Sequence, residues 1–103
     1  MKPVLIRREA RAELDDAMAF YESRAHGLGL DLQAKVEDAV VRIQQSPEAW
    51  PPHKRSGFRK CFTERFPFAG FYVELPDCIW IAAIAHGSRR PDYWRRRRFE
   101  QET

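Results

Sequence analysis

The sequence predicts a two-layer α+β domain in which a helical hairpin packs across a small, mostly antiparallel sheet. Two stretches in the first half carry apolar residues at helical spacing, and a short glycine-containing link joins them. A short branched run precedes them, and three apolar, β-type segments fill much of the second half. The order is therefore strand, helix, helix and three strands. A length of 103 residues favours one domain spanning residues 1–103.

The first predicted elements are a strand over Val4–Arg8 and a helix that begins near Glu9. The strand follows from its length and its branched side chains. The apolar positions of the helix, at i, i+3, i+4, i+7 and i+11, are Leu14, Ala17, Met18, Tyr21 and Ala25. The segment His26–Gly29, "HGLG", provides glycines for a helix stop and a tight turn.

A second helix with the same spacing follows at once. Its apolar positions are Leu32, Val36, Ala39, Val40 and Ile43. The pair Ser46-Pro47 ends it, because proline cannot continue a helix. Two amphipathic helices with a short link are expected to form an antiparallel hairpin, and each offers an apolar stripe that a sheet can cover.

The remainder of the predicted core is β. After an irregular loop over Ser46–Gly57, which holds three prolines, the predicted strands are Phe58–Arg65, Phe68–Leu75 and Cys78–His86. The last strand is almost entirely apolar, as expected of a central strand covered on both faces.

The charge distribution and the composition limit the kinds of function that the protein can have. Residues 1–50 carry seven basic and nine acidic side chains, whereas residues 51–103 carry eleven basic and six acidic ones. The second half carries a net charge of +5, which favours binding to a polyanion or an acidic protein. No segment reads as a signal peptide or a membrane span, so a cytoplasmic location without membrane contact is expected. The two cysteines, Cys61 and Cys78, follow no metal-binding spacing and are expected to be buried thiols; neither a metal nor a cofactor is expected.

The order βααβββ resembles the RelE/ParE superfamily of toxins from type II toxin–antitoxin modules, often described as plasmid stabilisation proteins. The stretches that carry the resemblance are "EARAELDDAMAFYE", "GLG", "SPEAWP", "RFPFAGFYVE" and "IAAIAHGSRRPDYWRRR". The resemblance implies a RelE/ParE-like fold and a growth inhibitor that a cognate antitoxin neutralises. It also implies that contact with operator DNA is made only indirectly, through the antitoxin.

The superfamily divides by target, and this division leaves three hypotheses. ParE-like members poison DNA gyrase without cutting anything, whereas RelE-like members cut mRNA on the ribosome as metal-independent endoribonucleases. The third hypothesis is a non-toxic regulatory module that binds nucleic acid. The sequence favours the ParE-like hypothesis, because the lysine pair typical of RelE-like nucleases is reduced to Lys54 and Arg55.

Candidate site residues follow from the chemistry that a nuclease would need. RNA cleavage without a metal requires a base, an acid and cations that hold the phosphate. The catalytic candidates, for the nuclease hypothesis only, are Arg65, His86, Arg89 and Tyr93. His86 suits proton transfer near neutrality, but it can equally be a histidine that simply ends a buried strand. The candidates for target or antitoxin contact are Arg59, Lys60, Arg90, Arg95 and Arg96.

Overall fold

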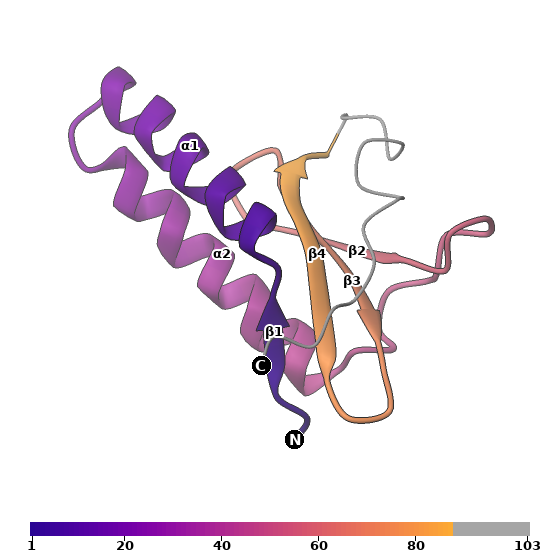
Figure 1. Ribbon diagram of the computed structural model, residues 1–103. Helices are drawn as coiled ribbons and strands as arrows, with labels where there is room; N and C mark the ends of the chain where they lie inside the picture. The colour runs from indigo at the N-terminus through magenta and orange to yellow at the C-terminus, as the bar shows by residue number, and fades with distance from the viewer. Residues whose placement is uncertain (88–103) are drawn as a thin grey trace.

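The computed structural model describes residues 1–87 and contains the predicted elements in the predicted order (Figure 1). The elements are β1 (Val4–Ile6), α1 (Arg8–Arg24), α2 (Leu28–Gln45), β2 (Arg59–Phe62), β3 (Phe68–Glu74) and β4 (Ile79–His86). The strands are shorter than predicted at several ends. β1 stops at Ile6, and β2 stops at Phe62 because the next residues turn toward β3.

The strands form one sheet in the order β1-β4-β3-β2. β1 pairs with β4 in parallel, and the other two pairings are antiparallel, which confirms the predicted α+β class and the mostly antiparallel sheet. β4 lies inside the sheet, and all of its residues from Ile79 to Ala85 are buried. The prediction of a central strand covered on both faces is therefore confirmed.

The helical hairpin covers one face of the sheet, with α1 and α2 running side by side in opposite directions (Figure 1). The buried side chains of this layer are Ala10, Leu14, Ala17, Leu32, Val36, Ala39, Ile43, Cys61, Phe66, Tyr72, Ile79, Ile81 and Ile84. The predicted stripe of α2 is thus confirmed, with Val40 partly buried beside it. On α1 the stripe ends early: Ala25 is the exposed C-cap residue, because the helix stops at Arg24.

The link between the helices uses its two glycines differently. Gly27 adopts a left-handed conformation with φ of 85°, which favours glycine. Gly29 already lies inside α2, and it is buried where the two helices approach closely. The carboxylate of Glu22 accepts hydrogen bonds from the backbone N–H groups of Gly27 and Gly29, and these bonds lower the pKa of Glu22.

A buried hydroxyl attaches the loop after α2 to the sheet. Tyr72, fully buried on β3, donates a hydrogen bond from its Oη to the carbonyl oxygen of Pro47 at 2.7 Å. Burial disfavours the phenolate and raises the pKa of Tyr72 to about 12. Cys61 and Cys78 are free, buried thiols, as predicted, and burial raises the pKa of both.

Candidate functional site

β4 extends beyond the end of its neighbour β1, and α1 covers the edge of β4 that β1 leaves unpaired. The last backbone bond between the β1 side and β4 joins the N–H of Arg7 to the carbonyl of Ile81. Three residues further on, the N–H of Ile84 donates to Oε1 of Glu13 at 3.2 Å. A side chain of α1 thus takes the place that a longer β1 would have filled, which positions the Glu13 carboxylate against the strand.

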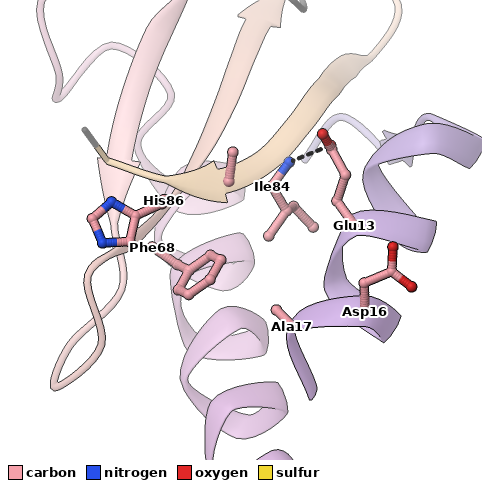
Figure 2. Close-up of a pocket in the computed structure, with 7 residues that line it drawn as sticks. Glu13, Asp16, Ala17, Phe68, Ile84 and His86 are labelled. Carbon is pink, nitrogen blue, oxygen red and sulfur yellow. Dashed lines mark hydrogen bonds between the residues drawn. The ribbon is translucent and has the colours of Figure 1, made fainter. Parts of the chain in front are cut away.

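A pocket of about 280 Å³ lies at this junction, between α1 and the end of β4, and is here called the β4 pocket (Figure 2). Its lining residues are Glu13, Asp16, Ala17, Phe68, Ile84, Ala85 and His86. Glu13 and Asp16 are three positions apart on α1, so both fall on the same side of the helix. The pocket therefore combines an apolar wall with two carboxylates and one imidazole.

Of the two predicted catalytic residues within residues 1–87, His86 lines this pocket and Arg65 does not. His86 is the last residue of β4 and is exposed, and its ring meets the ring of Phe68 edge-on with centroids 5.8 Å apart. Glu13 lies on the other side of Phe68 from His86 (Figure 2). A carboxylate and an imidazole on one pocket are groups that can accept and donate protons at a bound ligand.

Glu13 and Asp16 were missed as site residues by sequence reasoning. Their spacing shows that they share a helix side, but many exposed helix faces carry such pairs. The segment that makes them part of a pocket lies far away in the chain, since Glu13 and Ile84 are separated by 71 positions. Only the packing of α1 on β4 brings them together.

Arg65 lies at the same end of the sheet but is engaged elsewhere. The turn between β2 and β3 adjoins the end of β4, where the N–H of Gly87 donates to the carbonyl of Pro67. Arg65 sits in this turn with φ of 71°, and its guanidinium forms an ion pair with Asp31 of α2 at 3.3 Å. It also lies 5.4 Å from the ring centroid of Phe66. The residue thus joins the turn to α2.

The two described candidates for partner contact differ in availability. Arg59 directs its guanidinium to the carbonyl oxygens of Trp50 and Glu48 and so holds the loop before β2. Lys60 is exposed, and its ammonium lies 5.0 Å from the ring centroid of Phe62 and 5.9 Å from that of Phe71. Lys60 is therefore the cation of this pair that a partner can reach.

Five predicted site residues lie outside the described residues, and they are Arg89, Arg90, Tyr93, Arg95 and Arg96. Within residues 1–87, no three histidine, cysteine, aspartate or glutamate side chains lie close enough to hold a metal ion together. Neither described helix combines the length and the apolar character needed to cross a membrane.

Comparison with known proteins gives a match at the level of structure. No protein-family model and no curated protein sequence matches the chain. Among solved structures, the chain is similar to a chain from the chromosomal ParDE TA system of P. aeruginosa, with a TM-score of 0.63 and 22% sequence identity. The match covers 84% of this chain and 96% of that one. The chain therefore has the RelE/ParE-like fold that its sequence predicts.

Proposed function

We propose that the protein is the toxin of a type II toxin–antitoxin module and acts as a ParE-like inhibitor of DNA gyrase that a cognate antitoxin neutralises. The observation that carries this proposal is the similarity to a structure of a ParDE TA system, which extends over 96% of that chain. A fold alone does not determine a function, so the proposal also depends on what the described surface can do.

The β4 pocket favours binding over RNA cleavage as the mode of action. Cleavage of RNA without a metal needs cations that hold the phosphate and stabilise the transition state. The described lining of the pocket carries the carboxylates of Glu13 and Asp16 and no lysine or arginine. The nearby cation Arg65 is paired with Asp31. This charge pattern disfavours a phosphate at His86 and supports an inhibitor that acts through contacts with a protein target.

One observation favours the second candidate, a RelE-like mRNA endoribonuclease. His86 and Glu13 both line one pocket, as a general acid and a general base would. Two variants separate the candidates: Glu13→Gln keeps an oxygen that accepts from Ile84, and His86→Ala removes the imidazole. Both variants should keep their toxicity if the protein acts by binding, whereas a nuclease should lose at least about tenfold in activity with either change.

The proposal is tested by induced expression in a bacterial host, alone and together with the small protein encoded beside this gene. Expression alone should stop growth, and co-expression should restore it. Metabolic labelling then identifies the target, since a gyrase inhibitor stops DNA synthesis first and a ribosome-dependent nuclease stops protein synthesis first. Normal growth under both conditions would show that the protein is not a toxin.

A further inference from the structure

The segment between α2 and β2 ends in a turn, residues 53–58, that projects beyond the sheet on the side away from the α1–α2 link (Figure 1). Two backbone hydrogen bonds close this turn, from the N–H of His53 to the carbonyl of Phe58 at 2.8 Å and from the N–H of Gly57 to the carbonyl of His53 at 2.9 Å. Between them lie Lys54 and Arg55, which are both exposed. The segment, here called the basic turn, therefore carries two cations away from the body of the domain.

The side chain of His53 holds the basic turn in one shape. Its Nδ1 accepts hydrogen bonds from the backbone N–H of Arg55 at 3.3 Å and from that of Ser56 at 3.4 Å, and the Ser56 hydroxyl lies 3.3 Å from the same nitrogen. Oγ of Ser56 also accepts from the N–H of Phe58 at 3.2 Å. These backbone groups are satisfied inside the turn, so the side chains of Lys54 and Arg55 are the polar groups that it offers to a partner.

The loop that carries the basic turn is attached to the sheet at two places. Tyr72 on β3 donates to the carbonyl of Pro47 at 2.7 Å, and the guanidinium of Arg59 on β2 donates to the carbonyl of Trp50. The rings of Trp50 and Tyr72 also meet edge-on, with centroids 6.5 Å apart. The basic turn therefore meets a partner as a preformed element, which reduces the ordering cost of binding.

Charge is divided unevenly between the two sides of the molecule. The helices α1 and α2 together carry five basic and eight acidic residues, whereas residues 49–63 carry four basic residues and no acidic one. These four are Lys54, Arg55, Arg59 and Lys60. Within residues 1–87, the side chains of Lys54 and Arg55 form no ion pair. A polyanion is therefore attracted to the basic turn and repelled by the helices, which fixes the side from which it approaches.

We propose that the basic turn contacts the phosphate backbone of duplex DNA, with Lys54 and Arg55 each binding a phosphate. That the DNA is the segment on which gyrase acts rests on the proposed function, whereas contact with phosphates rests on the charge and geometry of the turn. Duplex DNA carries a phosphate about every 3.4 Å along each strand, so neighbouring cations on one rigid turn can both reach one. Contacts to the backbone carry no sequence information, so the toxin binds any duplex sequence.

The experiment is fluorescence anisotropy of a labelled random-sequence DNA duplex titrated with the full chain at several salt concentrations. The logarithm of the binding constant should fall linearly with the logarithm of the salt concentration. The double variant Lys54→Gln/Arg55→Gln should bind about tenfold more weakly at low salt, and its slope should be smaller by about two because two phosphate contacts are lost.

The double variant Arg8→Gln/Arg11→Gln is the matched control. It removes the same charge from two exposed positions on α1, away from the basic turn, and should keep the wild-type slope and bind within about twofold of the wild type. Thermal unfolding shows that both variants are folded. Equal changes in slope for the two double variants would overturn the proposal, because net charge alone would then explain the binding.

The outcomes also separate this inference from the proposed function. If the wild type does not bind the duplex, or if Lys54→Gln/Arg55→Gln binds it as the wild type does, the DNA contact is wrong, and inhibition of supercoiling still decides the proposed function. If the duplex binds as expected while gyrase works unchanged, the phosphate contact stands and gyrase is not the target. Tighter binding to a single-stranded RNA of the same length than to the duplex would overturn duplex DNA as the ligand.

Discussion

Gly29→Ala should destabilise the protein, although alanine is the better helix former. A Cβ at Gly29 would lie 2.6 Å from the carbonyl oxygen of Met18 and 3.2 Å from Oε1 of Glu22. The oxygen of Met18 belongs to the backbone of α1 and cannot rotate away. To reach an ordinary contact distance of about 3.4 Å, the two helices must separate by about 0.8 Å at this point.

The magnitude follows from two opposing terms. Overpacking of a well-packed contact costs about 1–3 kcal/mol. This substitution lies near the upper end, because the atom that a Cβ at Gly29 would meet belongs to the backbone of Met18. Replacing glycine by alanine inside a helix contributes about 1 kcal/mol in the other direction. The net expectation is a loss of about 2 kcal/mol in the free energy of unfolding, which corresponds to a fall of roughly 10 °C in Tm for a domain of this size.

Urea and thermal unfolding followed by circular dichroism measure this loss, and Gly70→Ala is the matched control. A Cβ at Gly70 would lie 3.6 Å from Cδ1 of Ile43, an ordinary van der Waals distance, so this variant should be as stable as the wild type or slightly more stable. If Gly29→Ala matched or exceeded the wild type in stability, the close approach of α1 and α2 at Gly29 would be refuted.

Two further predictions concern single polar groups. Tyr72→Phe removes the hydrogen bond to Pro47 and should cost about 1–2 kcal/mol at neutral pH in urea unfolding. Folding raises the pKa of Tyr72 to about 12, so the stabilisation by its hydroxyl is present below pH 10 and is lost as the pH rises toward 12. The difference in the free energy of unfolding between the wild type and Tyr72→Phe should therefore become smaller in this range. The Glu22 carboxylate accepts hydrogen bonds from the N–H groups of Gly27 and Gly29, so folding lowers its pKa. The stabilisation that this carboxylate provides is therefore present above the pKa of the unfolded state and is lost as the pH falls through the pKa of the folded state. A plot of Tm against pH should therefore show Glu22→Gln less stable than the wild type at neutral pH and equal to it in acid; a constant gap would contradict the assignment.

The fold was predictable because most of its elements are set by local patterns. The helical spacing of Leu32, Val36, Ala39 and Ile43 predicts the buried stripe of α2, and the apolar run of β4 predicts its central position. Gly29 shows the limit of local reasoning. The sequence pattern places Gly29 in the turn between the helices. In the structure a glycine is required there because α1 and α2 pack closely, with the carbonyl oxygen of Met18 next to the Cα of Gly29.

The candidate site was less predictable because it depends on contacts between distant segments. His86 was identified from its place after an apolar strand, and the structure places it on a pocket. Glu13 and Asp16 needed the packing of α1 against β4 to become visible. Arg65 likewise forms its ion pair with Asp31, which lies 34 positions away. No sequence pattern near either residue predicts this ion pair.

The most direct test of the proposed function is a supercoiling assay with purified DNA gyrase, relaxed plasmid and this protein. The ParE-like account predicts that increasing amounts of the protein inhibit supercoiling and that the small protein encoded beside its gene restores it. Glu13→Gln and His86→Ala should inhibit as the wild type does, since no proton transfer is involved. Supercoiling that proceeds unchanged at a large molar excess of the folded protein would contradict gyrase as the target.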